Sequence, residues 1–448
     1  MSRRLHGARA IGAAAWIACS CAAGPTSAGA FDVIGAGPVG VAEAGARAAR
    51  ATDASAAFYN PAGLGMGYGI HVDVAPTVGI SSLGVQGKGA ELADPFGFFL
   101  AGDATVPLTG LLEDRVRVAI ALYVPPTTAL HLLIDPPDQP QYPYFRNRTQ
   151  RLVVDPAIGI RVAQWLSIGV GADVLGGVEG PADVRPGASG APEPRISVDA
   201  TTQVAAHVGV RVDIGERVHL GAVYRQEFGV PIHITTRAEI GGIDLDADVR
   251  IQKALFDPHT FVLGAAFDVD RLELELDASY SVWSAYEGPA LGVRAELPGA
   301  LLTSEETSGL FHDVASIRGA ASYGVDVGRR SEIVLHAGTG FEPSVLSGAP
   351  QGASNFVDGP KIFGGLGASL ALRDVLPRTV RLALGLGVTG VLPETIEKKA
   401  CAKIPCPPGT VAGPDADDPS KGITDPGYPR LTSGGALWSG SLGIGVDL

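Results

Sequence analysis

After its first 30 residues the chain has no run of about 20 apolar residues, which is the length a transmembrane helix needs. Basic residues are also scarce: 34 lysines and arginines stand against 47 aspartates and glutamates, for a formal net charge of −13. Without a basic stripe to neutralise phosphates, the composition excludes a nucleic-acid-binding protein. These absences leave a membrane role open, because β-barrels cross bilayers with alternating strands whose sequence signal is weak.

The first 30 residues have the features of a secretory signal peptide. Three arginines precede an apolar stretch, "AIGAAAWIACSCAA", and small residues at Ala28 and Ala30 are typical of a cleavage site. We expect cleavage after Ala30. The mature chain would then carry 31 basic and 47 acidic residues, for a net charge of −16.

Cysteine is rare as well, and two of the four cysteines lie in the signal peptide. The others are Cys401 and Cys406, in "CAKIPCPPG". In an exported protein this spacing predicts a local disulfide. A metal site would need further ligands nearby, and the sequence offers none, so no metal and no cofactor is predicted.

The mature chain would begin with "FDVIGAGPVG", whose glycines 35, 37 and 40 match the dinucleotide-binding pattern G-x-G-x-x-G. That pattern requires a preceding buried strand and an acidic residue about 20 positions later. Neither is present, so the glycines are interpreted as allowing a segment to fold tightly.

Polar and apolar residues alternate through most of the remaining sequence. In residues 271–282, "RLELELDASYSV", the leucines share one face and the charged residues the other, and Asp277, Ser279 and Ser281 belong to the polar face. The strands are long and their connections alternate between short turns and long Gly/Pro-rich segments, including 179–196 and 284–312. This combination is typical of an outer-membrane barrel rather than a soluble sandwich.

The sequence therefore predicts an all-β protein, a transmembrane antiparallel β-barrel of about 14 strands with an N-terminal hatch, or plug, inside the lumen. The expected organisation is a signal peptide at 1–30, a hatch at 31–68 and a barrel at 69–448. Strands are expected to start near residues 70, 94, 115, 150, 167, 197, 218, 244, 271, 313, 332, 361, 379 and 434.

Residues 52–67, "TDASAAFYNPAGLGMG", resemble the FadL family of outer-membrane transporters for long-chain fatty acids and other hydrophobic compounds. Two further stretches, 277–288 and 335–372, are similar to a strand ending in tryptophan and to a late hairpin of that family. The resemblance implies that a hydrophobic solute enters from outside, rests in an apolar interior site and leaves sideways into the outer leaflet as the hatch moves.

The hatch supplies most of the residues expected to bind or gate the substrate. The asparagine–proline–alanine stretch either only folds the hatch or takes part in gating. A fatty carboxylate would need an inward cation, for which Arg225, Arg318 and Lys361 are candidates by residue type. The predicted substrate-binding or gating residues are Phe31, Val33, Ile34, Phe58, Tyr59, Asn60, Pro61 and Ala62.

Two other functions stay open beside passive uptake of fatty acids or other hydrophobic molecules. One is a structural or surface-binding barrel of the same fold that transports nothing. The other is an outer-membrane enzyme, but no nucleophile with an accompanying base can be recognised, so a non-enzyme is expected.

The expected location is the outer membrane of a Gram-negative bacterium, after removal of the signal peptide. The expected partners are a fatty acid or aromatic hydrocarbon ligand, outer-membrane lipids and the barrel-assembly machinery, and the barrel is expected to act as a monomer. Since aromatics make up only 6% of the residues, Trp165, Trp283 and Trp438 are expected to contribute to thin interfacial girdles.

Overall fold

The fold was analysed in a computed structural model. It describes residues 29–90, 92, 94–126, 140–146, 148–149, 151–179, 182–186, 192–196, 199–240, 243–286, 291–297, 300–303, 310–346, 355–375, 378–397, 399–401, 410–412 and 430–448. Most of the predicted signal peptide and Cys406 of the predicted disulfide lie outside these residues, so both remain predictions.

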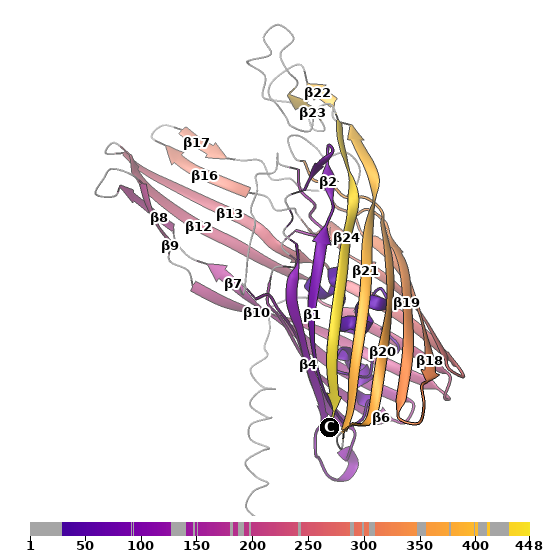
Figure 1. The fold of residues 1–448 in the computed structure, drawn as a ribbon. Coiled ribbons are helices and arrows are strands. Elements are labelled where there is room, and N and C mark those ends of the chain that lie inside the picture. Colours follow the sequence, from indigo (N-terminus) through magenta and orange to yellow (C-terminus); the bar gives the residue numbers. More distant parts are fainter. Residues whose placement is uncertain are drawn as a thin grey trace, which may run out of the picture.

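Within the described residues, fourteen long antiparallel strands form a closed barrel, as predicted (Figure 1). The first strand, β1, pairs with the last, β24, so that Val74 lies opposite Ile444. Two short strands, β2 (Gly84–Val85) and β3 (Lys88–Gly89), continue the same sheet. The barrel strands are β1 (Ile70–Ser81), β4 (Phe96–Thr105), β5 (Val116–Val124), β6 (Val153–Ala163), β7 (Leu166–Glu179), β10 (Asp199–Ile214), β11 (Val218–Arg225), β14 (Thr260–Val269), β15 (Leu272–Ser281), β18 (Val314–Asp326), β19 (Ser331–Glu342), β20 (Lys361–Val375), β21 (Arg378–Glu397) and β24 (Arg430–Asp447).

The alternation places side chains as predicted. On β15, Leu274 and Leu276 are exposed on the outer surface, whereas Glu275 and Asp277 are buried toward the lumen. Tight turns join strands at the end of the barrel that carries the C-terminus, and the turns at Gly215, Asp270 and Gly328 adopt positive φ. Among the described residues, no helix has the length and apolarity needed to cross a bilayer.

The strand expected near residue 244 is wrong as a barrel strand. Residues Ile243–Asp257 form β13, which belongs to a separate six-stranded sheet that projects from the barrel end opposite the C-terminus (Figure 1). The barrel strand at this point of the chain is β14. The other strands of the separate sheet are β8 (Ala182–Pro186), β9 (Pro192–Ile196), β12 (Phe228–Ile240), β16 (Leu291–Leu297) and β17 (Ala300–Thr303), so the segments 179–196 and 284–312 are not wholly loops.

The N-terminal segment lies inside the barrel (Figure 1). It forms three short helices, α2 (Gly29–Ile34), α3 (Gly37–Ala42) and α4 (Ala56–Tyr59), and a 3₁₀-helix, η1 (Pro61–Met66). Among the residues that the structure describes, no strand precedes the G-x-G-x-x-G motif, which forms the turn after α2 and the start of α3. Gly35 and Gly37 adopt φ of +82° and +76° there, which favours glycine.

The hatch rests on inward-facing glycines of the wall. Gly159, Gly169 and Gly209 lie side by side on β6, β7 and β10. An added methyl group at any of them would overlap hatch atoms of the Asn60–Gly65 region. A second row of glycines lies on β19, β20 and β21, where Gly338, Gly365 and Gly385 contact the backbone of hatch residues 38–44. The two rows together are called the glycine seat. Glycine on the inner face thus lets hatch and wall backbones touch directly.

Candidate functional site

Asn60 holds together the turn between α4 and η1. Its side chain is fully buried, and its Oδ1 accepts a hydrogen bond from the backbone N–H of Ala62 at 3.1 Å. Its Nδ2 donates to the carbonyl oxygens of Ala48, at 2.7 Å, and Val210, at 3.2 Å. Asn60 therefore caps η1 and also ties the hatch to strand β10 of the wall.

Wall side chains bind the hatch backbone at other points. Ser167 donates a hydrogen bond to the carbonyl oxygen of Ala62 at 2.6 Å, and Nε2 of His207 bonds that of Ala57 at 2.6 Å. The Asp277 carboxyl accepts from the N–H of Ala48 at 3.1 Å. Pro61 and Ala62 are buried in this contact and lie outside the linings of the cavities described next.

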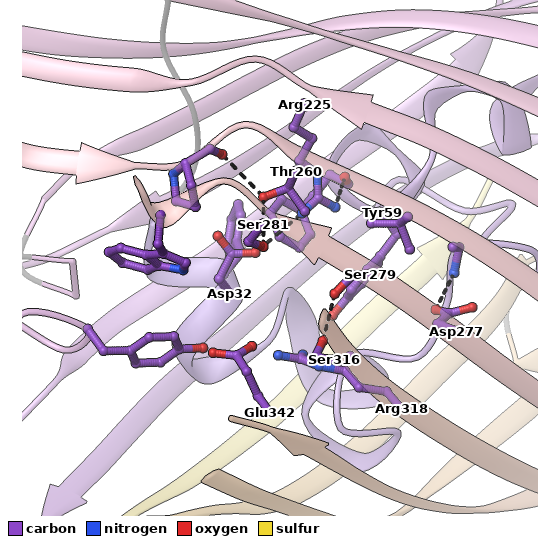
Figure 2. Close-up of a pocket in the computed structure, with 18 of the residues that line it drawn as sticks. Asp32, Tyr59, Arg225, Thr260, Asp277, Ser279, Ser281, Ser316, Arg318 and Glu342 are labelled. Atoms are coloured by element: carbon purple, nitrogen blue, oxygen red, sulfur yellow. Dashed lines mark hydrogen bonds and ion pairs between the residues drawn. The ribbon is translucent and has the colours of Figure 1, made fainter. Parts of the chain in front are cut away.

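A cavity of about 80 Å³ lies between α2 and strands β14, β15 and β18 (Figure 2). The hatch contributes Phe31, Phe58 and Tyr59 to its lining. Val33 and Ile34 instead line a second cavity of about 30 Å³. An engineered cavity of about 150 Å³ takes up benzene, so the larger cavity has room for the polar head of a ligand but not for a long acyl chain in this conformation.

Aromatic residues from three parts of the chain surround the larger cavity. Phe31 packs edge-on against Phe58, with ring centroids 5.2 Å apart. Tyr144 and Trp283 line the cavity, and their ring centroids lie 6.0 Å apart. Trp283 is only 2% exposed, so the prediction that it belongs to an interfacial girdle is wrong, whereas Trp165 and Trp438 are each 56% exposed.

Two of the arginines that line the cavity are neutralised by aspartates. Asp32 of α2 pairs with Arg148 at 3.1 Å and with Arg225 at 3.3 Å. Arg148 also pairs with Asp257 at 2.7 Å, and Arg225 donates to the carbonyl oxygen of Phe58 at 2.7 Å. Burial raises the pKa of the Asp32 carboxyl above its ordinary value, although Arg148 and Arg225 oppose that effect.

Arg318 is different, because no aspartate or glutamate in the described part of the chain forms an ion pair with it. Its Nη1 donates to the carbonyl oxygen of Ala44 at 3.1 Å, and its guanidinium carbon lies 4.2 Å from the ring centroid of Phe363. The guanidinium faces the cavity beside Ser316 (Figure 2). Its charge is held in place without a direct ion pair, although three carboxylates of the same cavity lining interact with it electrostatically at longer range.

Lys361 does not line the cavity but lies behind two residues that do. Its Nζ is fully buried, 2.8 Å from Asp358 and 3.7 Å from Glu342, and 4.3 Å from the ring centroid of Tyr144. Two carboxylates thus surround it. The structure therefore brings Arg225 and Arg318 to one cavity and does not bring Lys361 there.

Several lining residues were not proposed as site residues from the sequence: Asp32, Tyr144, Arg148, Thr260, Trp283, Ser316 and Glu342. Asp277, Ser279 and Ser281 were assigned only to the polar face of their strand. Alternation was therefore the one sequence signal for the wall residues. Tyr144 and Arg148 lie in a segment between strands that has no periodicity, so no sequence signal identified them. Within the described residues, no group of three or more histidine, cysteine, aspartate or glutamate side chains is arranged to hold a metal ion.

The arrangement can be compared with known proteins. No family model matches the chain, and no curated protein matches it. Solved structures do match over nearly their whole length. A FadL homologue from Pseudomonas aeruginosa is 13% identical, with a TM-score of 0.53, over 95% of this chain and 98% of its own.

Two further matches are a channel and a transporter. The CymD monoaromatic hydrocarbon channel is 13% identical, with a TM-score of 0.53, over 94% of this chain and 99% of its own. The chain has the FadL-type fold. The Ralstonia pickettii toluene transporter TbuX is 15% identical, with a TM-score of 0.50, over 93% of this chain and 100% of its own. At these identities the likeness establishes the architecture of a FadL-type barrel, and the ligand has to be argued from the cavity.

Proposed function

We propose that this FadL-type barrel is an outer-membrane channel for passive uptake of hydrophobic small molecules, and that it favours those with a carboxylate, such as long-chain fatty acids. The observation that carries the proposal is Arg318, the cavity-lining arginine with which no carboxylate of the described residues forms an ion pair. A ligand carboxylate would form that pair, while Phe31, Phe58, Tyr144 and Trp283 would contact the first part of its apolar body.

The cavity is less suited to an aromatic hydrocarbon such as toluene. Such a ligand would remove water from Arg318 and from the hydroxyls of the wall without forming hydrogen bonds to them. Leaving a buried polar group without a partner costs about 1–3 kcal/mol, and more for a charged group. A carboxylate on the ligand therefore distinguishes the two candidate classes, which are fatty acids and aromatic hydrocarbons.

Lateral release is part of the proposal. At the end of the barrel that carries the C-terminus, the lumen is lined with charged groups, where Arg381 pairs with Asp447 at 3.0 Å and His71 pairs with Asp103 at 3.0 Å. An apolar chain passing along the axis would have to displace the hatch and cross this charged region. Exit through the wall into the lipid avoids that cost. Outer-membrane barrels have short periplasmic turns, and the tight turns here lie at the C-terminal end, so that end would face the periplasm and the six-stranded sheet the outside.

The test is equilibrium binding of radiolabelled oleate to the barrel purified in detergent, with unlabelled toluene as competitor. Folding is checked by heat-modifiable migration in gels. Saturable oleate binding that excess toluene displaces poorly is expected. A folded barrel that binds no oleate would contradict the carboxylate proposal. Efficient displacement by toluene would favour a hydrocarbon ligand.

The alternative function is a structural barrel without transport. The hydrogen bonds between hatch and wall described above would suit a permanently closed lumen. A structural barrel would not need a cavity-lining arginine without an ion pair, which favours uptake.

A further inference from the structure

Four hydroxyl side chains lie on the cavity wall beside Arg318. Ser279 and Ser316 face each other on β15 and β18, with their oxygens 2.6 Å apart. Thr260 and Ser281 form a second pair on β14 and β15, with oxygens 3.2 Å apart (Figure 2). All four line the cavity.

These hydroxyls retain hydrogen-bonding capacity. A hydroxyl has one hydrogen to donate and two lone pairs to accept with. In the Ser279–Ser316 pair one hydrogen lies between the two oxygens, so the other hydrogen and at least two lone pairs are available to a ligand. Thr260 also lies 3.2 Å from the carbonyl oxygen of Pro258, to which it donates.

Another hydroxyl pair in the same barrel shows what a purely structural role looks like. Thr77 and Ser441 join β1 and β24 with oxygens 2.9 Å apart. They are 3% and 2% exposed and line neither cavity described above. The Ser279–Ser316 pair has the same cross-strand chemistry but lines a cavity beside Arg318, which forms no ion pair within the described residues.

We infer that the cavity recognises the head of a hydroxylated carboxylic acid, with the carboxylate on Arg318 and a hydroxyl on the Ser279–Ser316 pair. This inference rests on the proposed function and specifies its substrate class. A cavity of about 80 Å³ accommodates such a head while the apolar chain extends beyond it. The ligand hydroxyl uses the hydrogen-bonding capacity that an unsubstituted acyl chain leaves unfilled.

The spacing places the ligand hydroxyl close to the carboxylate. Arg318 and Ser316 are successive inward positions of one strand, and both line the cavity with the guanidinium beside Ser316 (Figure 2). A carboxylate bound to the guanidinium would therefore lie near the serine hydroxyls. This arrangement suits an acid whose hydroxyl is on a carbon near the carboxylate, such as a 3-hydroxy acid.

The test compares two ligands that differ by one hydroxyl, hexadecanoate and 3-hydroxyhexadecanoate, for equilibrium binding to the full-length barrel in detergent. We expect the hydroxy acid to bind about fivefold more tightly, the effect of one net hydrogen bond. Ser316→Ala should bring the two affinities together, and Ser279→Ala serves as a second variant if that protein misfolds. The matched control Ser441→Ala, which removes a hydroxyl from the Thr77 pair, should keep the preference.

The failures are distinguishable. Equal affinities in the unaltered barrel would overturn the inference and leave the proposed function standing. A preference that survives in both Ser316→Ala and Ser279→Ala would also overturn it. If the folded barrel binds neither acid, the proposed function itself fails.

Discussion

The two ends of the hatch contact the barrel in different ways. At residues 38–44 and 60–65 the hatch lies backbone against backbone on inward glycines of the wall, and Asn60, Ser167 and His207 add hydrogen bonds. Helix α2 instead contacts its surroundings through the aromatic ring of Phe31 and the ion pairs of Asp32, and the cavity lies beside it.

The difference shows how one inner surface can both seal and bind. Where the wall presents glycine, little space remains between wall and hatch, and the cavity beside Gly364 and Gly387 is only about 30 Å³. Where the wall presents serine, threonine and arginine, side chains hold the hatch away and leave the larger cavity.

Filling the glycine seat should displace the hatch. In Gly169→Val the new side chain would overlap the backbone of Pro61, and rigid backbone cannot move aside locally. We expect a barrel that still folds but conducts ions in planar bilayers far above the unaltered protein. The control Gly390→Val adds a side chain where the nearest atom is 3.8 Å away and should stay closed. Equal conductance in both variants would refute the sealing role.

Removing the Asn60 side chain should weaken the attachment of the hatch to the wall, while the hatch stays in contact with the wall glycines. Asn60→Ala leaves the carbonyls of Ala48 and Val210 without their donor, at a cost of about 1–3 kcal/mol for each unsatisfied group. We expect faster proteolysis within residues 48–62 while the barrel keeps its heat-modifiable migration. Uptake that persists unchanged in this variant, with the barrel intact, would show that Asn60 has no gating role.

Replacing Arg318 should weaken binding of acids selectively. Arg318→Met removes the guanidinium that would bind the ligand carboxylate. Hydrogen bonds to charged groups contribute about 1.5–3 kcal/mol, so oleate affinity should fall about 10- to 100-fold. Arg271→Met is the matched control, since Arg271 is an exposed arginine paired with Asp326 at 2.6 Å, outside the cavity lining. If both variants bind oleate as the unaltered protein does, another cation holds the carboxylate.

Acid should weaken the fixed part of the hatch. Burial alone would raise the pKa of Glu43, but Arg47, a hydrogen bond from His336 and Arg50 outweigh it and lower this pKa to about 2. A depressed carboxyl pKa stabilises the folded state above the ordinary value of 4.5, and this contribution is lost as pH falls from there toward 2. Hatch proteolysis with an acid-active protease should therefore rise in that window, and less so in Glu43→Gln.

The sequence predicted the barrel well wherever polar and apolar residues alternate strictly, as on β15. It misplaced one strand for a physical reason. Strand β14 shows little polar alternation, because between Thr260 and Asp268 its inner face carries only apolar or small residues, with Gly264 against the hatch. Residues 243–257 alternate strongly but form a strand of the separate sheet. Alternation shows that the two faces of a strand lie in different environments. It does not show to which sheet the strand belongs.

The cavity was only partly predictable. The hatch motif pointed to Phe58 and Tyr59, and residue type pointed to Arg225, Arg318 and Lys361 without distinguishing them. Their difference lies in partners distant in sequence: Asp32 lies 193 positions from Arg225, whereas Lys361 has Asp358 three positions away. Which cation is neutralised depends on the three-dimensional arrangement, so no pattern in the sequence identified Arg318.

The central claim is that the barrel admits acids passively by way of the Arg318 cavity. The most direct measurement is uptake of radiolabelled oleate by Gram-negative cells that lack their own fatty-acid channel and express either this protein or its Arg318→Met variant at equal levels of folded barrel. We predict uptake well above that of cells without the protein, and a large loss in the variant. Uptake no greater than in cells without the protein would contradict the claim and favour a structural barrel with a closed hatch.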